Sequence, residues 1–172
     1  MTPLPRRSDR VLLVGMMGAG KTTVGHALSC LLGWPYFDND ELLARAVGKD
    51  TRRVQTEDGE RALRRAESAA LDVALTEGGP LIAGVAGGIV LDPLDVQRLR
   101  DGGFVVWLRA DLTTLARRVA GTDRPWLGDD PLQALQKLAA GRDVLYQSVA
   151  SLIVDVDELP PDLIASRITS YL

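Results

Sequence analysis

The sequence predicts an α/β fold in three layers, with a five-stranded parallel sheet between helices on both faces. Two observations predict this class. Five short apolar runs alternate with segments of helical periodicity, and such runs are typical of parallel strands buried on both faces. A glycine-rich loop at 15–20 also follows the first run and precedes the first helix. No composition shift marks a linker, so we expect one domain over residues 1–172.

The first half of the chain contains two expected strands. The run at 11–14 is apolar, and the helix after the glycine-rich loop is expected to end at Gly33, a typical C′ residue. A short strand is expected at 35–37, followed by a helix over 41–47. Residues 51–77 are expected to be mainly helical, because small apolar side chains recur on one face.

The second half repeats the alternation. The next strand is expected at 81–85, and Asp92-Pro93 then supplies an N-cap and a proline at N1 for a helix that runs to Arg100. Asp130-Pro131 has the same pattern and predicts one long helix to about Tyr146. The remaining elements are expected to be strands at 104–108 and 152–154 and helices at 112–120 and 161–171.

Residues 15–22, Gly-Met-Met-Gly-Ala-Gly-Lys-Thr, match G-x-x-x-x-G-K-[ST], the phosphate-binding P-loop. A strand–loop–helix unit of this kind directs backbone N–H groups and a helix N-terminus at an anion. We therefore expect a nucleotide ligand, with Lys21 at its terminal phosphates and Thr22 on Mg²⁺. The alternative, a glycine-rich turn that matches by chance, is disfavoured by the flanking elements. The expected nucleotide-binding residues of the loop are Gly18, Ala19, Gly20, Lys21, Thr22 and Thr23.

Two carboxylates, Asp38 and Asp40, follow the second expected strand. In an extended segment, residues i and i+2 point to the same side, so one could lie near the metal and the other near a substrate hydroxyl. The alternative for Asp40 is a helix N-cap. Gly87 and Gly88 follow a buried strand and would let a ligand approach the backbone, although a plain turn is the alternative.

Arg64, Arg124 and Arg142 are candidates for binding an anionic substrate or the transferred phosphate, because a guanidinium group matches both anions. The alternative is that each is a solvated surface charge. Composition alone does not select these three.

Five motifs occur in order between about Val11 and Leu172: GMMGAGKTTVG, FDNDE, DGERALRRAE, VAGGIVLDP and DRPWL, the last followed by the helix with Arg142 and Tyr146. Together they resemble the shikimate kinase family, within the P-loop group of small-molecule kinases. The resemblance implies transfer of the γ-phosphoryl group of MgATP to the 3-hydroxyl of shikimate, a step toward chorismate and the aromatic amino acids. It also implies a monomer.

The resemblance implies a role for each matching residue. Asp40 would bind the shikimate hydroxyls and accept the proton, and Asp38 would hold Mg²⁺ through water. Segment 34–77 would bind the substrate, and segment 121–130 would form a lid. The other implied contacts are Arg64 and Arg142 with the carboxylate, Gly87 and Gly88 with the substrate, Arg124 of the lid with the phosphates, and Arg117 with the adenine.

Several positions depart from the family pattern. Ala86 replaces the first of three glycines, and Gln55 and Leu63 stand where aromatic residues are expected around the substrate. Trp126 replaces a leucine in the lid, and Leu159 stands where a second arginine often contacts the adenine. Another polyhydroxylated acid or a cyclitol is therefore an alternative acceptor, and a regulatory P-loop ATPase is a third reading.

Bulk properties exclude several other classes. A net charge of −3, with no basic stripe of interleaved aromatic residues, argues against a nucleic-acid partner. No apolar run is long enough for a membrane span. The lone cysteine and the polar N-terminus lead us to expect a cytoplasmic protein.

Overall fold

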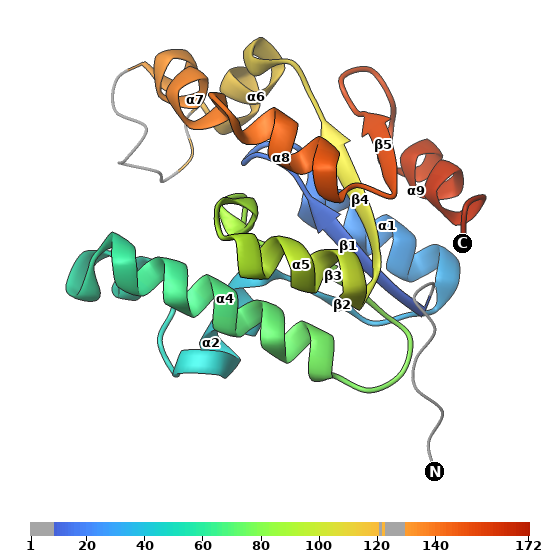
Figure 1. Ribbon diagram of the computed structural model, residues 1–172. Helices are drawn as coiled ribbons and strands as arrows, with labels where there is room; N and C mark the ends of the chain where they lie inside the picture. Colours follow the sequence, from blue (N-terminus) through green and yellow to red (C-terminus); the bar gives the residue numbers. More distant parts are fainter. Residues whose placement is uncertain (1–8, 121, 123–129) are drawn as a thin grey trace.

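The computed structural model describes residues 9–120, 122 and 130–172 (Figure 1). Its sheet has five strands in the order β2-β3-β1-β4-β5, and every neighbouring pair is parallel. The predicted fold class and all five predicted strands are confirmed. The strands are β1 (Arg10–Val14), β2 (Tyr36–Phe37), β3 (Leu81–Gly84), β4 (Phe104–Arg109) and β5 (Leu152–Asp155).

Strand β1 lies at the centre of the sheet. Leu12 is paired in register with Ala83 of β3 on one side and Val105 of β4 on the other. All five residues of β1 are buried. This burial explains the unbroken apolar run, since a parallel strand covered on both faces has no solvent side that could take polar residues.

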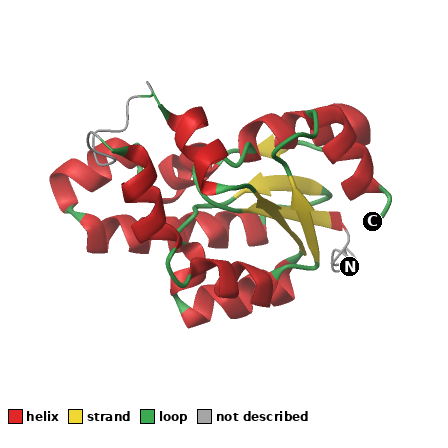
Figure 2. Ribbon diagram, turned by 90° about the horizontal axis from the view of Figure 1, so that it is seen from above, coloured by secondary structure: helices red, strands yellow, loops and turns green. Residues whose placement is uncertain are grey.

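Helices cover both faces of the sheet, as Figure 2 shows. Helices α1 (Lys21–Leu32) and α9 (Pro161–Thr169) pack together on one face. On the other face lie α4 (Glu60–Thr76), α5 (Pro93–Gly102) and α8 (Arg142–Val149) (Figure 1). The remaining helical segments are α2 (Asn39–Val47), α3 (Thr51–Arg53), the π-helix η2 (Val54–Asp58), the 3₁₀ helix η3 (Ile89–Leu91), α6 (Leu112–Val119) and α7 (Pro131–Ala139).

The helix ends mostly follow the predicted signals. Gly33 and Gly48 end α1 and α2 in the left-handed conformation, with φ of 69° and 71°. Asp92 caps α5 by accepting from the backbone N–H of Leu94. The single helix predicted from residue 131 to about Tyr146 is wrong. Gly141, with φ of 79°, separates α7 from α8, because a left-handed residue cannot continue a right-handed helix.

This break matters for the site. The turn at Gly141 starts a new helix at Arg142, so the arginine occupies the first turn of α8 rather than the middle of a long helix. No helix in the ranges described above is both long and apolar enough to cross a membrane.

Candidate active site

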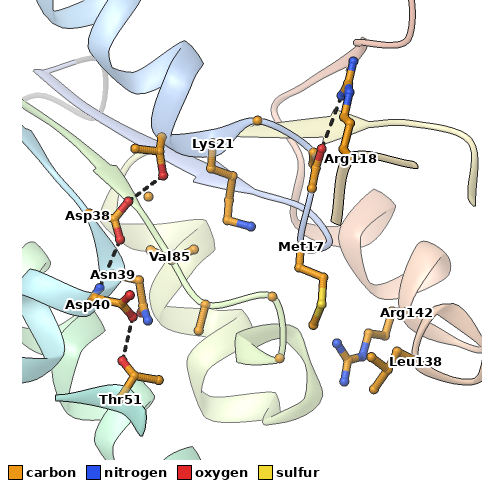
Figure 3. A pocket seen from close by; sticks show the side chains of 18 of the residues that line it. Met17, Lys21, Asp38, Asn39, Asp40, Thr51, Val85, Arg118, Leu138 and Arg142 are labelled. Atoms are coloured by element: carbon orange, nitrogen blue, oxygen red, sulfur yellow. Dashed lines mark hydrogen bonds between the residues drawn. The ribbon is translucent and has the colours of Figure 1, made fainter. Parts of the chain in front are cut away.

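A cavity of about 1170 Å³ opens at the carboxyl ends of the central strands. Its walls come from the P-loop, the start of α2, the segment α3–η2, the N-terminal half of α4, the loop after β3, and helices α7 and α8. Figure 3 shows Asp38 and Asp40 on one side of this cavity, Arg118 and Arg142 on the other, and Lys21 between them.

The P-loop wraps one end of the cavity. Gly15, Gly18 and Gly20 all have positive φ, a backbone conformation that residues other than glycine rarely adopt. A Cβ at Gly15 would also lie 2.6 Å from the carbonyl oxygen of Leu108. The Lys21 ammonium donates to the carbonyl oxygens of Gly15 and Met16 at 2.8 and 3.2 Å. The loop thus holds its lysine at the mouth of an anion-binding turn.

Asp38 takes part in three hydrogen bonds at one side of the cavity. Its Oδ2 accepts from Thr22 Oγ1 at 2.7 Å and from Tyr36 Oη at 3.0 Å, and its Oδ1 accepts from the backbone N–H of Asp40 at 3.2 Å. Burial alone would raise the pKa of Asp38, but these hydrogen bonds and the charge of Lys21 lower it overall. The carboxylate is therefore ionised at neutral pH.

The donors at this point fit Mg²⁺. A hydroxyl and a carboxylate beside a phosphate-binding loop are the hard oxygen ligands that Mg²⁺ prefers, and it commonly takes its remaining ligands from water and substrate phosphates. Among the described residues there is no cluster of three His, Cys, Asp or Glu that could hold a metal by itself. Thr22 and Asp38 are therefore the residues that could hold Mg²⁺ here, together with water and phosphate oxygens.

Asp40 lies on a helix and not on the extended segment that the sequence predicts. We expected Asp38 and Asp40 on an extended segment, but Asp38 is the N-cap of α2 and Asp40 lies in the first turn of that helix. The N-cap alternative therefore applies to Asp38 and not to Asp40. Both side chains still line the same cavity, and Oδ1 of Asp40 accepts from Thr51 Oγ1 at 2.6 Å (Figure 3).

Arg64 lies on α4 and faces the loop after β3. Its Nη1 donates to Glu67 at 2.8 Å, and a Cβ at Gly88 would come within 2.0 Å of the same nitrogen. Glu67 is almost buried, whereas about a third of the Arg64 side chain is exposed. Burial raises the pKa of Glu67 more than Arg64 lowers it. The ion pair orients the guanidinium group but does not fully offset the burial of the carboxylate.

Arg142 also lines the cavity, and it is only 7% exposed. One turn along α8, the fully buried Tyr146 donates a short hydrogen bond to the carbonyl oxygen of Gly87 and stacks on Trp107. Burial raises the pKa of Tyr146 to about 12, so its hydroxyl remains a donor at neutral pH. Helix α8 thus connects Arg142 to the glycine loop.

Two neighbouring arginines of α6, Arg117 and Arg118, differ in their relation to the cavity. Both are exposed, but only Arg118 lines the cavity. Arg118 donates to the carbonyl oxygens of Gly18 at 3.3 Å and Val156 at 2.8 Å. The reason is helical geometry, because consecutive residues point about 100° apart and only one of the pair can face the P-loop. Apolar residues complete this end of the cavity: Val156, Leu159, Pro161 and Ile164.

Most of the predicted lid, including Arg124 and Trp126, lies outside the described residues. Beyond it, helix α7 contributes to the cavity wall from one side, through residues Gln133, Ala134, Lys137 and Leu138. Of the predicted substrate contacts, the structure brings Asp40, Arg64, Gly87, Gly88 and Arg142 to one cavity.

Sequence reasoning missed three polar residues near the site. Thr51 and Tyr36 bind the two aspartates, and Glu67 binds Arg64. Glu67 had a usable signal, since it follows Arg64 by three residues on a helix and such pairs meet on one face. Thr51 had no such signal, because its hydrogen bond to Asp40 depends on the path of the connection between α2 and α3.

Comparison with known proteins agrees with this geometry. The family model described as Shikimate kinase matches residues 17–172. The chain belongs to the shikimate kinase family. A shikimate kinase of Thioalkalivibrio sulfidiphilus is 35% identical over 96% of this chain and 87% of its own length, and one of Dechloromonas aromatica is 37% identical over 94% and 87%. The fold of this chain matches that of the shikimate kinase from Acinetobacter baumannii in complex with shikimate. The TM-score is 0.88, with 30% identity, and the match covers 95% of this chain and 92% of that one.

Ala86, which departs from the family pattern, fits without backbone strain. No residue other than glycine has positive φ in the described part of the chain, so Ala86 has an ordinary backbone conformation. Gly87 and Gly88 do not have positive φ either. A side chain at 88 would therefore have to displace the guanidinium group of Arg64, whereas the backbone conformation at 88 does not call for glycine.

Proposed function

We propose that this member of the shikimate kinase family transfers the γ-phosphoryl group of MgATP to the 3-hydroxyl of shikimate. The observation that supports this most strongly is that one cavity joins a complete P-loop to Asp40 and two arginines, Arg64 and Arg142. A small polyhydroxylated carboxylate is complementary to that set. The arginines suit its carboxylate, and the aspartate suits a hydroxyl.

The P-loop would bind the phosphates through the backbone N–H groups of 18–23 and through Lys21. Lys21 would exchange its two loop carbonyls for phosphate oxygens, so its charge is already close to where negative charge develops. Thr22 and Asp38 would hold Mg²⁺, which supplies positive charge to the phosphates when it is bound. Arg118 would contact the nucleotide at the end of the cavity that Leu159 and Ile164 line.

On the acceptor side, Arg64 and Arg142 would hold the carboxylate, with Gly87 and Gly88 leaving room for the ring. Asp40 would orient the reacting hydroxyl and accept its proton as the phosphorus–oxygen bond forms. The bond from the γ-phosphorus to the β,γ-bridging oxygen breaks, and ADP leaves.

We propose that segment 34–77 forms the substrate-binding part of one kinase domain over 1–172. Segment 121–130 would be a lid that brings Arg124 to the phosphates and excludes water.

We propose further that the enzyme works as a monomer in the cytoplasm, with small molecules and no nucleic acid as its partners. The lone cysteine supports the cytoplasmic location, and the net charge of −3 supports the absence of a nucleic-acid partner.

Product identification tests the function. Purified protein with MgATP and shikimate should give ADP and a phosphate monoester, whose ³¹P resonance couples to the proton on carbon 3 of the ring. A phosphate at another hydroxyl, or release of inorganic phosphate alone, would contradict the proposal.

A second acceptor class is favoured by one observation. Gln55 lines the cavity, and its side chain makes no hydrogen bond to the described residues. An unpaired amide in a binding cavity suits a polar substituent of the ligand. A screen of cyclitols and polyhydroxylated acids tests this. An acceptor with a much higher kcat/KM than shikimate would then be the preferred substrate in place of shikimate.

A further inference from the structure

Thr51 makes the one side-chain hydrogen bond to the Asp40 carboxylate within the described residues. Its Oγ1 lies 2.6 Å from Oδ1 of Asp40, and both residues line the cavity. Figure 3 shows the two side chains pointing toward each other across the turn between α2 and α3. The bond uses the single proton of the threonine hydroxyl, so Thr51 is the donor and the carboxylate the acceptor.

The local fold fixes where Thr51 lies. Helix α2 ends at Gly48 in a left-handed turn, and Asp50 then caps α3 by accepting from the backbone N–H of Arg53 at 2.8 Å. The short connection between them brings Thr51 back to the first turn of α2. The wide η2 turn follows directly, and π-turns of this kind are frequent at functional sites.

Asp40 is consequently held at two points. Its backbone N–H donates to Oδ1 of Asp38, and Oδ1 of its own carboxylate accepts from Thr51. Oδ2 makes no hydrogen bond with the described residues and is left for the acceptor hydroxyl. A hydroxyl donor on one oxygen thus sets the direction in which the other oxygen points, which is what proton transfer from a positioned hydroxyl requires.

We propose that Thr51 is a positioning residue for this reaction, and that its hydrogen bond orients Asp40 toward the acceptor hydroxyl. The inference rests on the proposed function, since it assigns Thr51 a role only through Asp40. Thr51 itself touches neither the phosphates nor the transferred group in this account. It therefore affects turnover and acceptor use but not ATP binding.

The test compares Thr51→Val, which keeps the shape and removes the donor, with Thr51→Ser, which keeps the donor. Thr51→Val should lower kcat about tenfold with the KM for ATP unchanged, because hydrogen bonds to charged groups are stronger than neutral ones. Thr51→Ser should recover to within about threefold of the wild type, because it keeps the donor and loses only a methyl group. Thr56→Val is the matched control, since Thr56 lies in the same segment but bonds only to backbone carbonyls and does not line the cavity.

A double-variant cycle separates positioning from folding. In an Asp40→Asn background, Thr51→Val should change the residual rate by less than about twofold, because the two side chains act as one unit. Three results would each overturn the inference: Thr51→Val with wild-type kcat, a serine variant no better than valine, or additive losses in the cycle. If Thr51→Val does not fold, Thr51→Ala replaces it in the same comparison. Wild-type protein without shikimate-dependent turnover would instead overturn the proposed function, so the two failures are distinct.

Discussion

The guanidinium group of Arg64 lies directly against the backbone of Gly88, where a Cβ atom would be 2.0 Å from Nη1. No side-chain rotation at residue 88 could relieve this overlap, because the backbone fixes the position of a Cβ atom. The arginine would have to move instead. A side chain at 88 would therefore displace the arginine that we assign to the acceptor carboxylate. Substrate binding and the shape of the loop after β3 are thus connected through one residue.

Gly88→Ala should raise the KM for shikimate about tenfold or more, with little change in the KM for ATP, since a misplaced guanidinium loses a charge-assisted contact worth roughly 1.5–3 kcal/mol. Steady-state kinetics with each substrate varied measures both. Gly78→Ala is the control, because Gly78 is exposed and a Cβ there meets nothing within 4 Å. Equal KM values for shikimate in both variants would refute the assignment of Arg64.

Arg118→Ala should raise the KM for ATP by about five- to tenfold, the equivalent of one hydrogen-bonded contact. Arg117→Ala should stay close to wild type, because Arg117 does not line the cavity. The pair is adjacent in sequence and matched in charge, so general electrostatics affect both alike. A larger effect at 117 than at 118 would contradict our assignment.

Tyr146→Phe should lower the free energy of unfolding by about 1–3 kcal/mol, because it leaves the carbonyl of Gly87 without its buried donor. Urea denaturation measures this loss. Tyr171→Phe is the control, since Tyr171 is 58% exposed. The KM for shikimate should rise in the first variant only, because the Gly87–Gly88 loop loses its anchor to α8. Unchanged stability and KM would show that the bond is dispensable.

Glu67 should impose a pH dependence on stability. Burial raises its pKa in the folded state above the ordinary value near 4.5, so the folded protein binds a proton that the unfolded chain has lost. Its contribution is therefore most favourable below pH 4.5 and is lost as the pH rises through the folded-state pKa.

Thermal unfolding across that window, for wild type and Glu67→Gln, measures the effect. Relative to the variant, the wild type should lose stability as the pH rises. Glu60→Gln is the control, because Glu60 also pairs with Arg64 but its side chain is 79% exposed. A difference between wild type and Glu67→Gln that is constant with pH would mean that the pKa of Glu67 is not raised.

Much of this molecule could be predicted from local patterns. The unbroken apolar runs gave the strands, because a strand buried on both faces has no polar side, and Gly33 and Asp92 marked helix ends through their own backbone chemistry. The long helix from 131 was overpredicted because Gly141 is compatible with a helix in sequence, and only its φ of 79° reveals a break.

The site was harder to predict in its details. The motifs predicted that Asp40, Arg64 and Arg142 share one site, and all three line one cavity, but two of their neighbours in space depend on tertiary structure. Thr51 meets Asp40 because of the turn between two helices, and Gly88 matters because a residue from another element lies above it. Which of Arg117 and Arg118 lines the cavity depends on the rotation of α6, and sequence spacing does not fix this rotation to within one residue.

The most direct test of the central claim is ADP release with MgATP, measured with and without shikimate, for wild type, Asp40→Asn, Arg64→Ala and Arg65→Ala. Arg65 lies beside Arg64 on α4 but is exposed and does not line the cavity. We predict shikimate-dependent turnover in the wild type and the Arg65 variant, and its loss by at least about a hundredfold for Asp40→Asn, since a positioned proton acceptor contributes about that much or more. Arg64→Ala should require a far higher shikimate concentration. ADP release that ignores shikimate, or that survives in Asp40→Asn, would contradict the account.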